Sequence, residues 1–444
     1  MVPHPNMLWL VGLGLVPLTA LIAWSPAFAQ IAGPFALLLI ALACLDAVLS
    51  RDLASHFTIT MPPLTRMTRG QADQIRIKIK STRGDKRSFR IALEGGSALN
   101  SDTPDIRGLT LNEQELVNNW HCTPHARGQF KLPFAHLETP SMFRLWMIRY
   151  AHPVNAEVRV FPDLRDQRKK ASSLFLRRQQ DGIASIRQMG KGREFEMLRE
   201  YVRGDSYEDI HWRSTAKRRQ PITKTYQIER TQEIYVMIDV SRLSGKPMHT
   251  PDGEPAEPVL ERFIQSAMLL QQAAAQQGDL FGLVVFSNKI DRFVRARGGK
   301  THYTSCAEAL YTLQPRKVSP DFESVFAFIR TRLRKRALMI FLTDLEDPVI
   351  AETFVKNTEM ISHQHLVFAN VMTDPEVEPI FGQCEVNSNI DLYARLARHL
   401  QWKNTRELGL ELSRKGVHFN QMDEVNATTQ VISQYMQVKQ RQLL

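Results

Sequence analysis

The segment REYVRGDSYEDIHWRSTAKRRQPITKTYQ, residues 199–227, is the stretch around which the rest of the chain is arranged. Two apolar segments and a strand-rich region precede it, and alternating strand and helix patterns follow it. Aromatic residues and charges of both signs are dense within it, so we expect internal ion pairs there. We interpret this segment as the junction between two soluble parts of the molecule.

The spacing of apolar residues at the start of this junction predicts a short helix. Phe195, Leu198 and Val202 recur at positions i, i+3 and i+7, which places them on one face of a helix. Gly204 then supplies a backbone that tolerates a turn. We therefore expect this first helix to end at Gly204.

A second short helix and a strand are expected to complete the junction. Ser206, followed three residues later by Asp209, has the character of a capping box. The helix is expected to carry residues 210–217 and to stop before Pro221, which cannot continue it. Residues 222–228 are then expected to be extended.

Two apolar segments lie within residues 1–50. Residues 7–24 are uncharged, and residues 31–49 carry only Asp46, close to their end. At 1.5 Å per helical residue, each is long enough to cross the hydrocarbon layer of a bilayer. We predict a transmembrane helical hairpin and expect Asp46 to reach water at the helix end. The alternative is a cleaved signal peptide, because residues 27–29 read Ala-Phe-Ala.

Basic residues predict how such a hairpin would be oriented. The loop of residues 25–30 contains none, whereas the second apolar segment is followed by Arg51, Arg66, Arg69, Arg76, Lys78 and Lys80. By the positive-inside rule, the soluble parts would face the cytoplasm. We therefore expect a multi-pass protein of the inner (cytoplasmic) membrane.

The composition favours an anionic neighbour in a reducing compartment. The chain has 444 residues and a net charge of +11, and its four cysteines are scattered without the paired spacing of metal ligands. Lipid headgroups, an acidic protein or nucleic acid would satisfy the charge. Carboxylates interleave with the basic residues of the junction and would repel phosphate, so we do not expect nucleic acid.

Residues 51–163 are expected to form an antiparallel, β-sandwich-like domain. Ile75, Ile77 and Ile79 alternate with basic residues, which is the pattern of a half-buried strand. Short segments of the same kind, separated by turn residues, cover residues 88–93, 128–132 and 157–161.

Residues 231–444 are expected to form a doubly wound α/β domain. Apolar strands are predicted at 233–240, 280–286, 337–343, 365–372 and 417–420, with an antiparallel edge at 290–297. Helices are predicted at 257–276, 301–313, 322–334, 349–362, 389–414 and 424–440. Strands separated by helices of this length indicate a largely parallel sheet, which binds ligands beyond the carboxyl ends of its strands.

The junction resembles the signature of a known bacterial family. Arg-Glu-Tyr, Gly-Asp, Ile-His-Trp-Arg and Ser-Thr-Ala-Lys-Arg, together with a strand ending in Ile-Asp-Val-Ser, are similar to the domain-of-unknown-function 58 family. The residues that carry this signature, and that would form a partner surface, are Arg199, Glu200, Tyr201, Gly204, Asp205, Ile210, Trp212, Arg213 and Ala216. Residues 164–230 would then comprise a basic linker and this signature. One turn, residues 139–143, departs from the pattern of the family.

The resemblance also implies an architecture and a partner. It implies a membrane hairpin, a β-rich domain and a von Willebrand A-like α/β domain, with a MoxR-type AAA+ ATPase as the protein partner. In the von Willebrand A fold, an Asp-x-Ser-x-Ser loop helps to hold a divalent cation. This chain keeps Asp239 and Ser241 but has Leu243 in place of the second serine, and the expected threonine is not evident near residues 319–321. Asp344 closes a later strand, so we interpret the site as degraded and expect neither Mg²⁺ nor another cofactor.

No enzyme motif is evident in the sequence. It contains no phosphate-binding Gly-Lys-Ser/Thr loop, no Gly-x-Ser-x-Gly elbow and no His-Glu-x-x-His pair, and we assign no catalytic residue. We expect a membrane-anchored adaptor that binds protein partners. The alternative is a metal-dependent hydrolase, or a divalent-cation-dependent ligand-binding protein, that uses the loop after the first α/β strand.

Overall fold

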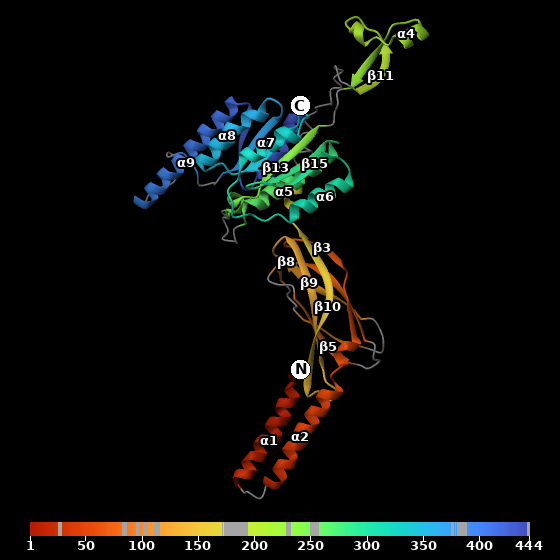
Figure 1. Ribbon diagram of the computed structural model, residues 1–444, viewed down its shortest axis with the longest axis vertical. Coiled ribbons are helices and arrows are strands. Elements are labelled where there is room, and N and C mark those ends of the chain that lie inside the picture. Colours follow the sequence, from red (N-terminus) through yellow and green to blue (C-terminus); the bar gives the residue numbers. More distant parts are fainter. Residues whose placement is uncertain are drawn as a thin grey trace. The chain divides into compact units, whose positions relative to one another are not determined.

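The computed structural model describes residues 1–24, 29–81, 87–94, 98–100, 105–110, 116–170, 172, 194–227, 232–248, 257–373, 377, 379 and 389–441. The chain forms two compact units, Met1–Asp163 and Leu164–Leu444 (Figure 1). Residues 173–193, which make up most of the basic linker predicted before the signature, lie outside the described residues.

The N-terminal unit begins with two helices that contact each other, α1 (Pro5–Trp24) and α2 (Ala29–Leu49) (Figure 1). Many of their apolar side chains are exposed, including Leu8, Trp9, Leu13, Val16, Leu37, Leu38, Ile40 and Val48. Among the residues that the structure describes, no helix combines the length and apolar character that a membrane crossing requires. The two segments that were predicted to form the hairpin are helical. Their role as membrane spans stays a prediction.

A buried carboxylate joins helix α2 to the β-rich part of the same unit. Asp46 is fully buried, and its two oxygens accept hydrogen bonds from the hydroxyls of Ser50 (3.2 Å) and Ser141 (2.5 Å). The backbone N–H groups of Phe143 (3.1 Å) and Leu145 (3.3 Å) donate to it as well. The expectation that Asp46 reaches water is therefore wrong, because a turn nearly 100 residues later in the chain surrounds it. We call this arrangement the Asp46 latch.

The turn in this latch is the one that departs from the family pattern. The Ser141 backbone N–H donates to the carbonyl of Trp146, and Arg144 has a left-handed backbone with φ 57°. The Trp146 indole N–H also donates to the carbonyl of Ala43 in α2, at 2.9 Å. The turn thus points N–H and O–H donors toward the C-terminal part of α2.

Two sheets form the rest of the N-terminal unit. The first has the order β1-β10-β9-β5-β7, with β3 also paired to β10, and the second has the order β2-β4-β8-β6. The strands are β1 (Val2–Pro3), β2 (Phe57–Thr60), β3 (Leu64–Thr68), β4 (Asp73–Ser81), β5 (Arg87–Leu93), β6 (Leu99–Asn100), β7 (Asp105–Thr110), β8 (Leu116–Pro124), β9 (Gly128–Pro140) and β10 (Trp146–Phe161). All pairings are antiparallel except β3 with β10.

One apolar core is shared by both sheets. Ile75, Ile77 and Ile79 of β4 are buried in it, as the alternation of the sequence predicted, together with Leu132 of β9 and Val158 of β10. The alternate residues Arg76, Lys78 and Lys80 are exposed. The prediction of an antiparallel β-rich N-terminal part is confirmed.

The C-terminal unit contains a mixed, mostly parallel sheet of order β15-β14-β13-β16-β17-β18. Its strands are β13 (Glu233–Asp239), β14 (Leu280–Phe286), β15 (Ile290–Arg297), β16 (Leu338–Thr343), β17 (Leu366–Met372) and β18 (Val417–Met422). Its helices are α5 (Val259–Gln276), α6 (Lys300–Tyr311), α7 (Phe322–Arg332), α8 (Pro348–Ser362), α9 (Asn389–Arg414) and α10 (Ala427–Arg441). Only β15 pairs antiparallel, as expected for the edge.

Helices cover this sheet because its central strands are apolar on both faces. Every residue of β16 is buried, which is typical of a parallel sheet enclosed by helices. Helix α5 contacts α6 and α10, and α8 contacts both α7 and α9 (Figure 1). The predicted mostly parallel sheet with intervening helices is confirmed.

The last helix is fastened by a second buried carboxylate, at the start of β14. Asp279 is fully buried and accepts hydrogen bonds from the Tyr435 hydroxyl (2.5 Å), the Lys439 ammonium (2.6 Å) and the Gln232 backbone N–H (3.0 Å). Burial raises the pKa of Tyr435 well above its ordinary value, and the bond to Asp279 adds to the effect. We call this arrangement the Asp279 latch.

Candidate functional site

The first candidate site lies where the order of the parallel strands reverses. Strand β13 has β14 on one side and β16 on the other, so the loops after β13 and β16 leave the same edge in different directions. Ligands of open α/β sheets bind at such a point. Asp239, Ser241, Thr343 and Asp344 lie there, and together with Lys246 we call them the strand-end cluster.

Both oxygens of the Asp239 carboxylate accept hydrogen bonds from the protein. One oxygen accepts from the Ser241 backbone N–H and the other from the Thr343 hydroxyl, both at 2.7 Å. All three residues are fully buried. Burial raises the pKa of Asp239 to about 6, against the opposing effect of these hydrogen bonds.

An ammonium group neutralises the second carboxylate of the cluster. Lys246 Nζ lies 2.5 Å from Asp344 Oδ2 and 2.6 Å from Glu346 Oε2. Burial opposes the charged form of this lysine, but the Asp344 and Glu346 carboxylates together outweigh that effect and raise its pKa. Lys246 was not predicted as part of this site, although a lysine only five residues after Ser241 lies close enough in the sequence to suggest a charge partner for it.

These residues do not fit a divalent cation. Both oxygens of Asp239 already accept hydrogen bonds, the buried Leu243 offers no oxygen ligand, and Lys246 already brings a positive charge to Asp344. In the described part of the chain, no three His, Cys, Asp or Glu side chains lie close enough to hold a metal ion. Asp321 instead caps α7, accepting from the Ser324 backbone N–H.

A threonine hydroxyl does reach Asp239, but it belongs to Thr343, directly before Asp344, and not to residues 319–321, where the resemblance implied a threonine. Asp239, Ser241 and Asp344, the three residues that the resemblance implied, lie at the ends of the neighbouring strands β13 and β16, together with Thr343.

Replacing Lys246 with alanine tests whether this lysine serves as the cation of the cluster. We expect the variant to lose about 1 kcal/mol of unfolding free energy, because the lysine is partly exposed and water screens its pairs. Millimolar Mn²⁺ is expected to raise the melting temperature of Lys246→Ala but not that of the wild type. Lys415→Ala, which breaks an exposed pair with Glu359, is the control. Stabilisation of the wild type by Mn²⁺ would contradict this reading.

The second candidate site is the segment 194–227, which we call the signature module. It consists of β11 (Glu194–Glu200), a 3-10 turn at Tyr207–Asp209, α4 (Trp212–Arg218) and β12 (Ile222–Gln227). Strands β11 and β12 pair antiparallel with one irregularity between Phe195 and Met197. The predicted first helix is therefore wrong, because pairing with β12 imposes an extended backbone. The predicted second helix begins only at Trp212, and the Ser206 side chain makes no capping bond.

The charged signature residues are paired inside the module. Arg199 lies 2.6 Å from Asp205, whose other oxygen accepts from the Val202 backbone N–H at 3.0 Å. That N–H bond and the Arg199 guanidinium lower the pKa of Asp205. Gly204 has φ 112°, a backbone conformation that favours glycine, and so allows the loop to close. The expectation of internal ion pairs is confirmed here.

Aromatic and apolar side chains remain exposed on the same module. Tyr201 and Tyr207 are stacked, with ring centroids 6.0 Å apart, while Ile210 and Ile222 are buried. Among the side chains of the module whose burial the structure describes, the exposed large ones are Leu198, Val202, Tyr207 and Trp212, of which Trp212 is 68% exposed and Tyr207 75%. Glu200, Arg213 and Ala216 are exposed as well. Some signature residues, such as Arg199, Gly204 and Asp205, therefore hold the module together, whereas others, such as Trp212, are exposed on its surface.

Comparison with known proteins identifies one family. Residues 197–389 match the model of the family described as "Protein of unknown function DUF58". Comparison with curated protein sequences gave no match.

Similar solved structures include three of unrelated description. The ASH/PapD-like domain of human CEP192 is 11% identical with TM-score 0.18, covering 24% of this chain and 87% of that one. WR4, an MSP family member of C. elegans, is 8% identical with TM-score 0.17, covering 24% and 97%. Proximal thread matrix protein 1 of the mussel byssus is 9% identical with TM-score 0.25, covering 47% and 45%. Similarity at this level carries no functional argument.

Proposed function

We propose, from the premise that residues 197–389 form a DUF58 family domain, that this chain is a non-enzymatic adaptor which binds a protein partner through its signature module. The observation that carries the proposal is the exposure of Trp212 and Tyr207 on a small module whose charges are paired internally. Tryptophan, tyrosine and arginine dominate the binding energy of protein interfaces. Rings exposed to this extent contribute little to the stability of the module itself, so their exposure favours contact with a partner.

The N-terminal helix pair would hold the adaptor at a membrane. Large apolar side chains are exposed along both helices, such as Leu37 (68%) and Val48 (72%), and extended exposed apolar surface marks sites of contact with a membrane or a protein. Lipid would cover that surface, and the basic residues after α2 would then lie at the inner membrane, on the cytoplasmic side. Flotation of the full chain with liposomes tests this part of the proposal.

The partner that we propose is a MoxR-type AAA+ ATPase, and the C-terminal unit would be a von Willebrand A-like head. Two observations support a von Willebrand A-like fold for this unit. They are the strand order with its antiparallel edge β15, and the position of Asp239 where the strand order reverses. The partner rests on the family resemblance of the signature. Neither part requires a bound metal, which agrees with the poor fit of the strand-end cluster to a cation.

Replacing Trp212 with alanine is expected to reduce capture of the ATPase at least tenfold without changing the melting temperature, because this side chain packs against little of the protein. Recovery is measured by mass spectrometry after affinity capture of the full chain from membranes, with a non-hydrolysable nucleotide present. Tyr393→Ala, an equally exposed aromatic residue in α9, is the control. Recovery that is equal for both variants and the wild type would exclude the module as the binding surface.

A further inference from the structure

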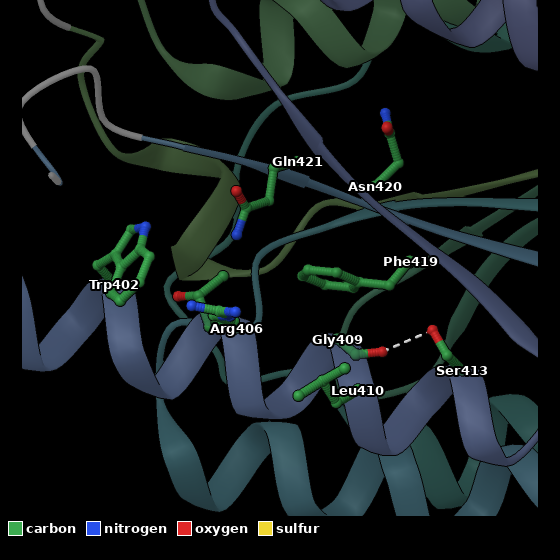
Figure 2. A pocket seen from close by; sticks show the side chains of 9 residues that line it. Trp402, Arg406, Gly409, Leu410, Ser413, Phe419, Asn420 and Gln421 are labelled. Carbon is green, nitrogen blue, oxygen red and sulfur yellow. Dashed lines mark hydrogen bonds between the residues drawn. The ribbon is translucent and has the colours of Figure 1, made fainter. Parts of the chain in front are cut away.

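A groove is lined by residues of helix α9 and of strand β18. It has a volume of about 520 Å³ and is lined by Trp402, Thr405, Arg406, Gly409, Leu410, Ser413, Phe419, Asn420 and Gln421. Figure 2 shows Trp402, Arg406 and Leu410 on the helix, with Phe419, Asn420 and Gln421 on the strand. The volume is within the range of specific ligand sites. Neither candidate site described above includes these residues.

The strand side of the groove is the edge of the sheet formed by the described residues. Strand β18 is the last in the sheet order and, in the described part of the chain, pairs only with β17. The Met422 carbonyl faces β17, because it accepts from the Thr373 N–H at 3.0 Å. Backbone groups of successive strand residues point to opposite sides, so those of Phe419 and Gln421 face outward. These groups can pair with one further strand.

The floor of the groove is fixed by close packing. A Cβ atom on Gly409 would lie 2.8 Å from the Phe419 ring, so only glycine allows α9 to approach the strand this closely. Residues Leu412 of α9 and Val417 of β18 belong to the buried core beneath. The groove therefore exists before any ligand binds, which reduces the entropic cost of binding.

The helix side of the groove offers a cation on an aromatic platform. The Arg406 guanidinium lies 5.3 Å from the centre of the Trp402 ring, which itself stacks on His399. The nearby Glu407 pairs with Lys403, at 3.7 Å. Among the described residues, no carboxylate forms an ion pair with Arg406. A guanidinium held in this way favours a carboxylate ligand, which it can bind through two parallel hydrogen bonds.

We propose that this groove binds an extended segment of a protein partner, which adds a strand to β18 and places an acidic side chain on Arg406. Free backbone groups on one wall and a cation on the other are the two elements of strand-addition recognition, in which main-chain bonds give affinity and side-chain pockets give specificity. The site is separate from the signature module. Binding of a strand at β18 can therefore occur whether or not the signature module binds the proposed ATPase.

Two labelled eight-residue peptides test the proposal on the full chain in detergent. One alternates valine with glutamate, and the other carries lysine in place of each glutamate. We expect saturable binding of the glutamate peptide by fluorescence anisotropy, and at least tenfold weaker binding of the lysine peptide. Arg406→Glu should reverse this preference. Gln421→Pro should weaken the glutamate peptide at least tenfold, because proline removes an outward N–H that an edge strand can lose without unfolding.

Lys403→Glu is the matched control, since it makes the same charge change on α9 outside the groove lining. Its affinity for the glutamate peptide should stay within about twofold of the wild type, as expected for an exposed charge. Absence of saturable binding, or unchanged binding by Gln421→Pro, would overturn the proposal. Dimerisation of the wild type that Gln421→Pro abolishes would also overturn it, because β18 would then pair with a second copy.

Discussion

Replacing Asp46 with alanine is expected to lower the unfolding free energy of the N-terminal unit by about 3 kcal/mol or more, because each buried donor that is left unsatisfied costs about 1–3 kcal/mol. Four donors would lose their acceptor, two of them backbone N–H groups in the turn at 141–145. The carboxylate itself lies in the last turn of α2, where the helix dipole disfavours a negative charge. Its donors therefore have to outweigh that effect.

Hydrogen exchange read by mass spectrometry is the direct measurement for the Asp46 latch. Amides of residues 141–146 should exchange much faster in Asp46→Ala, because the turn loses its central acceptor. Asp52→Ala, which removes an exposed carboxylate six residues later, should leave their exchange unchanged. Slow exchange of the turn in both variants would show that the latch contributes little.

Replacing Asp279 with alanine is the second large effect that we expect, a loss of about 3–5 kcal/mol from the C-terminal unit. The change would leave the buried Tyr435 hydroxyl without its acceptor. It would also remove the carboxylate that pairs with the Lys439 ammonium, which is 22% exposed and would keep its hydrogen bond to the Gln277 carbonyl. Helix α10 would then lose its polar attachment to the start of β14. Denaturant unfolding followed by circular dichroism measures the loss.

A paired change separates the ion pair from simple damage to packing. In Asp279→Leu combined with Lys439→Leu, both charges are gone, so the loss should be smaller than the sum of the two single losses. Asp423→Ala, which removes an exposed acceptor near α10, should cost far less than Asp279→Ala. Additive single and double losses would argue against a coupled latch.

The repeating patterns of the sequence predicted most of the fold correctly. Alternating Ile75, Ile77 and Ile79 identified a half-buried strand, and uninterrupted apolar segments identified the enclosed strands of the C-terminal sheet. Such patterns report burial on one or two faces of an element, and burial is what the fold fixes most strongly. The antiparallel edge at β15 was predicted in the same way.

The errors arose where distant residues override a local pattern. Phe195, Leu198 and Val202 have helical spacing, yet β12, more than 20 residues later, pairs with β11 and makes it a strand. Asp46 looked like a residue at a solvated helix end, but its donors come from residues 141–145. Thr343 was overlooked because its hydroxyl reaches Asp239 only through the pairing of β13 with β16.

Strand β10 sets a length scale for the N-terminal unit. It begins at Trp146, beside the Asp46 latch, and runs for 16 residues to Phe161. At about 3.3 Å per residue this is a rod of about 50 Å, shortened slightly by its bulge. The helix pair is attached to one end of that strand, so the length of β10 sets the distance between the helices and the far end of the strand. Any protein that must touch both the helices and the far end of β10 has to extend across the whole distance.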